Sequence, residues 1–227
     1  MNLHTLDNPV YNALNEMHQD FAISIDSLKA YQPEILPFGG FKDLIADENT
    51  LSELSKLTSN FMIIGNLEPR IPAHLEIKNL ITCYQMMNET LIEENYTDEI
   101  VFLNENYQSE LYEIITTFYS GFFRKKTAVL GNYYGIFRDQ KLVAVTGERF
   151  NTNNFTEVSA VVTNTDYTGL GLAKQLVTFV NNRIIKNAKT PFLHVDVKNT
   201  GAIKLYEKLG FKVRTEIKVW VIGNKNL

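Results

Sequence analysis

Residues 157–173 read EVSAVVTNTDYTGLGLA, and this stretch carries the clearest structural signal in the chain. Its first half belongs to the β-rich run Phe155–Thr163, and the amphipathic pattern over Leu172–Ile185 predicts a helix. Between them, Gly169 and Gly171 allow backbone N–H groups to face a ligand. The N-terminus of a helix adds unpaired donors and a partial positive charge. The stretch therefore predicts a strand, a loop and a helix that can bind a phosphate group.

Two glycines before a helix are, taken alone, equally consistent with a tight turn that binds nothing. The loop is too short for a P-loop, and no Gly-Lys-Ser/Thr follows it. Lys174 stands where the dinucleotide-binding fingerprint requires a third glycine. Whether the loop binds a ligand, and which ligand it binds, therefore has to be inferred from the neighbouring sequence.

On both sides of this stretch, the sequence predicts further strands and helices. Tyr133–Arg138 and Lys141–Phe150 are separated by Asp139-Gln140, which is the spacing of a hairpin. Gly210 is placed to end the last helix. The other expected elements are a short buried strand at Ile100–Leu103, a helix at Glu110–Tyr119, a strand at Pro191–Val197, a helix at Thr200–Leu209 and a strand at Glu216–Ile222. Residues 96–227 therefore predict one α/β domain.

Residues 1–95 predict a smaller N-terminal subdomain of helices and strands. Apolar residues at helical spacing predict a helix over residues 8–32, with Pro9 in its first turn and Asp7 or Asn8 as its cap. Pro33, Pro37 and Gly39-Gly40 interrupt the pattern, and a short helix at Leu51–Leu57 and strands at Phe61–Gly65 and Leu75–Met87 follow.

Composition excludes several classes of protein. The 227 residues carry a net charge of -4, and the densest basic cluster is only Arg124–Lys126, so we expect no nucleic-acid partner. No apolar run reaches the ~18 residues that a membrane span needs, and no basic N-terminal region precedes an apolar stretch. These features favour a cytoplasmic protein without a membrane partner. The single cysteine, Cys83, lies in an apolar run and is expected to be a buried, inert thiol.

Two motifs in the second half resemble those of the GNAT N-acetyltransferase superfamily, in particular its branch of glycine N-acyltransferase-like enzymes. Residues 168–173 are similar to the nucleotide motif Gln/Arg-x-x-Gly-x-Gly/Ala, and residues 199–211, NTGAIKLYEKLGF, match Asn-x-x-Ala-x-x-Leu-Tyr-x-x-x-Gly-Phe. The resemblance covers about residues 98–222. It implies an α/β (α+β) GNAT fold, in which helices flank a mixed, twisted central sheet with splayed central strands. The N-terminal α/β subdomain adds to this fold, and a degenerate half-copy of the same fold is one interpretation of it.

The resemblance also implies an activity. It predicts an acetyl-CoA-dependent N-acetyltransferase that moves the acetyl group directly to a primary amine of a small molecule or peptide, without a metal. A monomer or a homodimer is expected. One alternative is a non-catalytic GNAT-fold module that binds CoA as a sensor or scaffold, and another is an unrelated α/β nucleotide-binding protein. The acceptor side is expected to involve the N-terminal region and Ser120–Lys126, which contain no recognisable substrate code.

Specific residues acquire roles through the resemblance. Tyr206 matches the general acid that protonates the CoA thiolate, although a core tyrosine is the structural alternative. His194 is a candidate general base, and Glu157 or Glu148 could act through water, although such residues are often structural. Thr168 stands where the family has Gln or Arg, so the loop is expected to bind mainly through backbone amides. The expected acetyl-CoA contacts are Val161, Val162, Thr163, Thr168, Gly169, Leu170, Gly171, Leu172, Ala173, Lys174, Asn199 and Tyr206.

Overall fold

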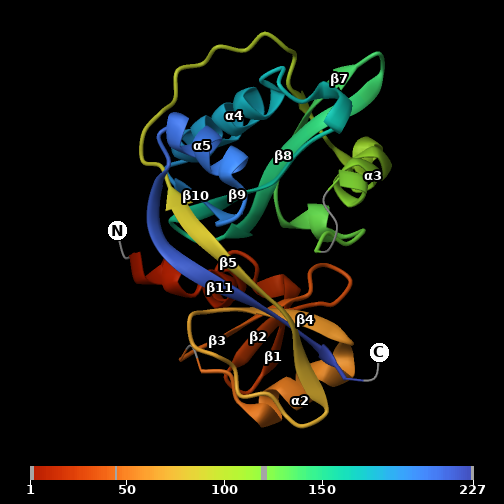
Figure 1. Cartoon of the computed structure of the whole chain (residues 1–227), viewed down its shortest axis with the longest axis vertical. Helices are drawn as coiled ribbons and strands as arrows, with labels where there is room; N and C mark the ends of the chain where they lie inside the picture. The colour runs from red at the N-terminus through yellow and green to blue at the C-terminus, as the bar shows by residue number, and fades with distance from the viewer. Residues whose placement is uncertain (1–2, 44, 119–121, 226–227) are drawn as a thin grey trace.

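The structure is a computed structural model that describes residues 3–43, 45–118 and 122–225. One continuous sheet of eleven strands, in the order β1-β2-β3-β4-β11-β5-β10-β9-β8-β7-β6, runs through the described part of the chain (Figure 1). The strands are β1 (Ala22–Ile25), β2 (Leu28–Tyr31), β3 (Phe38–Phe41), β4 (Asn60–Ile64), β5 (Leu75–Met87), β6 (Val101–Phe102), β7 (Tyr133–Arg138), β8 (Lys141–Asn151), β9 (Phe155–Thr163), β10 (Thr190–Asp196) and β11 (Lys212–Asn224).

Helices flank this mixed sheet. The α-helices are α1 (Pro9–Asn15), α2 (Glu48–Leu57), α3 (Gln108–Phe118), α4 (Leu172–Lys186) and α5 (Thr200–Lys208), and short 3-10 turns are η1 (Leu3–Asp7), η2 (Gln19–Phe21), η3 (Glu105–Tyr107), η4 (Thr127–Leu130) and η5 (Thr165–Tyr167). The elements expected after residue 98 are confirmed within a few residues, with two qualifications. The strand expected to be buried at Ile100–Leu103 is a two-residue edge strand with Phe102 exposed, and Tyr119, the expected end of α3, lies outside the described residues.

The helix expected over residues 8–32 is much shorter than predicted. Helix α1 ends at Asn15, and residues 22–31 form a β-hairpin instead. Ile23 and Ile25 alternate with polar Ser24, so a strand period was hidden inside the apparent helical spacing. Pro9 opens α1 as expected, but Asn8 uses its side chain to donate to the Phe41 carbonyl at 2.6 Å instead of capping the helix.

Strands β5 and β11 are the long pair that joins the two halves of the sheet (Figure 1). They pair antiparallel from Met87–Lys212 to Leu75–Asn224, and β11 also pairs with β4. Strand β5, from the first half of the sequence, pairs with β10 as well. The sheet is therefore continuous across residue 95. The division into subdomains 1–95 and 96–227, and the half-copy origin of the first, stay predictions.

The two faces of the sheet carry different helices. On one face, α4 and α5 pack through Leu176, Val180 and Tyr206 onto the strand residues Val158 and Val195. On the other face, residues of α1 and of the segment up to Phe38 pack in a cluster with Cys83 and Phe192. Because successive strand residues point to opposite faces, His194 and Asp196 lie on the same side of β10 as Phe192.

The central strands splay apart. Parallel pairing of β9 with β10 includes only Thr190–Phe155, Pro191–Thr156 and Phe192–Glu157, although both strands continue beyond these pairs. From Val158 and Leu193 onward, the facing edges of the two strands do not pair with each other. The predicted splay is thus confirmed, and it opens the middle of the sheet.

A buried histidine joins the N-terminal segment to η4, shortly before β7 begins. The ring of His18 is bonded to the Tyr31 hydroxyl at 2.8 Å and to the Leu130 carbonyl at 3.0 Å. A carbonyl only accepts, so the Nε2–H of His18 donates to Leu130 and Nδ1 accepts from the Tyr31 hydroxyl. Burial lowers the pKa of His18 from its ordinary 6.5 to about 4, against the hydrogen bond to Leu130, which favours the charged form.

The lowered pKa of His18 predicts that the protein loses stability in mild acid. Between pH 6.5 and pH 4 the unfolded chain binds a proton that folded His18 does not bind, so the free energy of unfolding falls as the pH falls through this window. At ~1.4 kcal/mol per pKa unit, the contribution is about 3 kcal/mol. The free energy of unfolding, measured with urea at pH 7, 5 and 4, should fall less with pH in His18→Gln than in the wild type, because glutamine cannot bind the proton. Parallel curves for the two proteins would contradict this assignment.

Candidate functional site

A cavity of about 630 Å³ lies at the splay between β9 and β10. Ala173, Leu205 and Tyr206 line it from the α4 and α5 side of the sheet. Phe38, which lies in the cluster on the opposite face, also lines it, together with His194. The cavity therefore extends through the sheet and connects two compartments, one beside α4 and α5 and one beside the N-terminal segment.

The glycine loop sits at the start of α4. Gly169 and Gly171 have φ angles of 81° and 76°, which is the left-handed region that favours glycine. No side chain caps α4, so its first N–H groups lack the usual capping partner. Thr168 donates its hydroxyl to the Thr165 carbonyl at 2.9 Å, which braces the loop instead of reaching toward a ligand. These features fit the expected backbone-based anion site.

The remaining loop residues predicted to contact acetyl-CoA have different environments. Leu170 and Lys174 are exposed, whereas Leu172 is buried in the cluster under α4. Ala173 lines the cavity. Only backbone groups are thus available at Leu172, while Ala173 connects the loop to the cavity.

A bulge shapes β9 where it leaves β10. Ser159 pairs with Gly147 and Val162 with Val145, so two residues of β9 face a single residue of β8. Within the bulge, Ala160 has a φ angle of 52°, which is unfavourable for a residue with a Cβ atom. Val161 lines the cavity, but the lining includes neither Val162, which packs in the α3 cluster, nor Thr163. The bulge redirects backbone groups at the splay.

Tyr206 and Asn199 both line the cavity at its α5 side. Tyr206 lines the cavity and is otherwise buried, with its ring 6.0 Å from that of Phe211 in an edge-on arrangement. Asn199 lines the cavity too, and its side chain accepts from the Ala202 N–H at 3.1 Å as the cap of α5. Asn199 therefore caps the helix in addition to facing the cavity.

His194 belongs to a buried ion-pair cluster. Glu157, whose side chain is only 1% exposed, accepts two hydrogen bonds from Arg149 at 2.7 and 2.8 Å, and it accepts one from His194 Nδ1 at 2.7 Å. Burial raises the pKa of Glu157, but the charge and hydrogen bonds of Arg149 and the bond from His194 outweigh it and bring the pKa to about 2. Glu157 is thus a charged group at all ordinary pH values.

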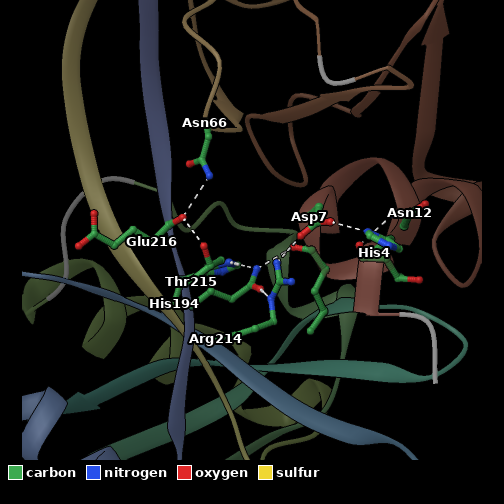
Figure 2. Close-up of polar contacts among 11 residues, drawn as sticks. His4, Asp7, Asn12, Asn66, His194, Arg214, Thr215 and Glu216 are labelled. Atoms are coloured by element: carbon green, nitrogen blue, oxygen red, sulfur yellow. Dashed lines mark hydrogen bonds and ion pairs between the residues drawn. The ribbon is translucent and has the colours of Figure 1, made fainter.

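A chain of hydrogen bonds continues from His194 to the surface. Gln85 Nε2 lies 3.0 Å from His194 Nε2, the Gln85 oxygen accepts from Arg214 at 2.5 Å, and Arg214 binds Asp7 at 2.5 Å. Figure 2 shows Asp7, Arg214 and His194 in line along this chain. Because guanidinium groups only donate, Arg214 fixes the Gln85 amide with its oxygen toward Arg214 and its NH₂ toward His194.

This orientation fixes the tautomer of His194. Nε2 accepts from Gln85, so the proton of the neutral ring sits on Nδ1 and is donated to Glu157. Both ring nitrogens are engaged, although the ring lines the cavity. His194 can take a proton at Nε2 only if the hydrogen bond from Gln85 breaks.

Glu148 and Cys83 lie in surroundings that indicate structural roles. Glu148 is buried, does not belong to the cavity lining, and accepts from the backbone and side-chain N–H groups of Asn132 at 3.1 and 2.9 Å. It therefore holds the turn before β7. Cys83 is buried in the wall of the cavity, and burial raises the pKa of its thiol to about 12, which agrees with an inert thiol.

Three site residues were missed by the sequence analysis: Arg149, Gln85 and Asp196. Arg149 and Asp196 line the cavity, and Gln85 contacts His194. Asp196 could have been found, because a strand places it on the same face as His194. Arg149 and Gln85 depend on strand pairing between distant segments. Among the described residues, no helix is long and apolar enough to span a bilayer, and no group of three or more His, Cys, Asp or Glu side chains is arranged to hold a metal ion.

Comparison with known proteins agrees with this architecture. Residues 133–221 match the family model of FR47-like proteins. A GNAT-family protein from Novosphingobium aromaticivorans is 25% identical, with a TM-score of 0.88 over 98% of this chain and all of its own. A GCN5-related N-acetyltransferase from Kribbella flavida is 12% identical, with a TM-score of 0.64 over 96% of this chain and 95% of its own.

A sequence relative covers a shorter stretch. Mycothiol acetyltransferase of Corynebacterium aurimucosum is 40% identical over 70 residues, which is 30% of this chain and 23% of that protein. The chain thus spans less than a quarter of that relative's length in the match. Together, the comparisons and the splayed sheet show that the protein has the GNAT acetyltransferase fold. Within this fold, the stretch that is similar to FR47-like proteins runs from β7 into β11.

Proposed function

We propose that the protein is an acetyl-CoA-dependent N-acetyltransferase that transfers the acetyl group directly to a primary amine of a small molecule or peptide. The observation that carries this proposal is the cavity at the splay, which joins the Tyr206 compartment to the His194 compartment. Such a passage lets a thioester and an amine meet from opposite faces of the sheet. The similarity to mycothiol acetyltransferase and to GNAT-family proteins supports an acetyl-transfer reaction. A place in the glycine N-acyltransferase-like branch is part of the same proposal.

The α4 side would hold the CoA moiety. Backbone N–H groups around Gly169–Lys174 bind the pyrophosphate, supported by the helix N-terminus. The pantetheine arm lies in the splay, where the edges of β9 and β10 do not pair with each other. The bulge at Ala160 and Val161 supplies a backbone N–H to the thioester carbonyl as it becomes an oxyanion.

The reaction needs a neutral amine and a protonated thiol. A water molecule accepts the proton of the incoming ammonium, the neutral nitrogen attacks the thioester carbon, and the C–S bond breaks as Tyr206 protonates the sulfur. The proton that the new amide nitrogen loses returns through water to the Tyr206 oxygen. Among the candidate bases, Glu157 is a weak proton acceptor because its pKa is about 2. His194 has both nitrogens engaged. We therefore assign these two a positioning role and assign Glu148 the structural role that its bonds to Asn132 describe.

Binding and turnover can be tested separately. Calorimetry with CoA is expected to give saturable binding, and a thiol-release assay with acetyl-CoA and a panel of primary amines is expected to show amine-dependent release. Binding without release by any amine would favour the CoA sensor alternative. Absence of CoA binding would overturn the proposal and favour an unrelated nucleotide-binding function.

The glycine loop provides a matched variant. Gly171→Ala is expected to weaken CoA binding about tenfold, because a Cβ atom disfavours the left-handed backbone by about 1–2 kcal/mol and shifts the loop. Gly201→Ala is a suitable control, since Gly201 lies within α5 and its added Cβ meets nothing closer than 3.9 Å. Equal affinities for CoA in the two variants would remove the loop from the binding site.

A further inference from the structure

Asp196 is a carboxylate that the ion-pair cluster of the cavity does not include. It lines the cavity on β10, on the same face as His194. One oxygen accepts from the Lys198 N–H at 2.8 Å. Among the described residues, Asp196 forms no ion pair, whereas the charge of Arg149 is matched by Glu157. Asp196 therefore gives its compartment an uncompensated negative charge.

Asp196 also lies on the part of β10 that borders the splay. It is the last residue of β10, beyond the final pair with β9, and it lies opposite Cys83 of β5. A group bound to its free carboxylate oxygen would stand beside the splay. This position suits the reacting nitrogen of an acceptor.

Apart from Asn79, Arg149, Ser159 and His194, the side chains that line this compartment are mainly apolar. Apolar side chains from five separate segments contribute to its walls: Phe38, Ile64, Ile81, Phe122, Val219 and Val221. Burying an apolar body against such walls is favourable, whereas burying a second carboxylate near Asp196 would bring two like charges together. The compartment therefore combines the carboxylate of Asp196 with a mainly hydrophobic wall, in which Arg149 is already paired with Glu157.

We propose that Asp196 binds the acceptor's amine group, and that the acceptor is a primary amine attached to an apolar body, with no carboxylate beside the amine. This inference rests on the proposed acetyltransferase function and specifies its substrate class. An alkylammonium donates to the carboxylate in a charge-assisted hydrogen bond, and its hydrocarbon part packs against Phe38 and Ile81. Free glycine lacks the body and carries the unwanted carboxylate.

The test measures binding of a probe, 2-phenylethylamine, to the protein saturated with CoA, which contains no acetyl group and so permits no turnover. We expect 2-phenylethylamine to bind, and 2-phenylethanol, L-phenylalanine and glycine to bind at least tenfold more weakly. Asp196→Asn should weaken the binding of 2-phenylethylamine at least tenfold and leave the affinity for CoA within twofold of the wild-type value. Asp20→Asn, the same change at an exposed residue of η2, is the control and should change neither affinity.

Three results would overturn the role of Asp196 or the proposed substrate class. Equal binding of 2-phenylethylamine to the wild type and to Asp196→Asn would overturn the role of Asp196. Binding of glycine or L-phenylalanine as tight as that of 2-phenylethylamine, or no binding of 2-phenylethylamine with CoA in place, would overturn the substrate class. Because CoA binding is measured on its own, a failure of the proposed function would be recognised separately. The wild-type comparison among the four probes does not depend on the variant folding.

Discussion

Replacing Glu157 with glutamine is expected to lower the free energy of unfolding by about 3–5 kcal/mol, the range for a buried ion pair that loses one partner. Arg149 would keep its charge in a site where its side chain is only 14% exposed, opposite a neutral amide. The amide would also present a single acceptor oxygen where the carboxylate now binds both Arg149 and His194. For a chain of this length, the loss corresponds to a melting temperature lowered by on the order of 10 °C.

Thermal and urea unfolding of Glu157→Gln beside Glu216→Gln would check this prediction. Glu216 is exposed on β11, where Figure 2 shows its side chain directed away from the chain of polar contacts, so its variant should unfold like the wild type. Replacing Arg149 with methionine in the Glu157→Gln background should recover part of the loss, because it removes the unpaired charge. A change below 1 kcal/mol for Glu157→Gln would contradict the view that this cluster stabilises the fold.

The same variant should also reduce catalysis more than its stability loss explains. Without a carboxylate to accept the Nδ1 proton, His194 loses the contact that fixes its tautomer. The ring and Arg149 then become free to move in the wall of the cavity. Activity measured below the melting transition therefore reports the positioning role separately from folding.

The second half of the chain was predictable because local patterns and the overall fold agree there. The run Phe155–Thr163 and the helix after Gly171 have strong, uninterrupted periodicities, and both stand where the structure has them. In the first half, residues 22–31 contain both a helical and a strand period. Pairing with β3 selects the strand, and that partner is too distant in sequence for local periodicity to indicate it.

The candidate site likewise combines residues that the sequence predicts with contacts that depend on tertiary structure. Tyr206 and Asn199 belong to one short motif, and they do line one cavity. The contacts that decide the state of His194 come from Gln85 and Arg214, which strand pairing brings together from distant segments. The sequence could indicate His194 as a candidate site residue, but the hydrogen bonds of its two ring nitrogens follow from tertiary contacts.

The bulge in β9 is a further feature that sequence alone did not indicate. Positive φ angles are usually carried by glycine, but the residue in the bulge is Ala160. Its unfavourable backbone persists because both neighbours of the bulge, Ser159 and Val162, stay paired with β8. The strain lies beside the passage through the sheet, at the position where the proposed mechanism uses a backbone N–H.

Tyr206→Phe is expected to lower turnover about a hundredfold, which is within the range for loss of a general acid. Phenylalanine keeps the ring packed against Phe211 and removes only the hydroxyl group. The affinity for CoA and the KM for acetyl-CoA should therefore stay within about twofold of the wild type, so the loss falls on kcat. Steady-state thiol release with the fastest amine of the panel, together with calorimetry, separates the two quantities.

Tyr134→Phe is the matched control for this prediction. Tyr134 is buried in the same cluster as Tyr206 but does not line the cavity, so removing its hydroxyl group should leave turnover unchanged. Equal turnover of Tyr206→Phe and the wild type would exclude Tyr206 as the acid and assign thiolate protonation to solvent. A fall in CoA affinity matching the fall in kcat/KM would instead show that the hydroxyl group binds the cofactor. The acid role therefore requires both a loss in kcat and an unchanged affinity for CoA.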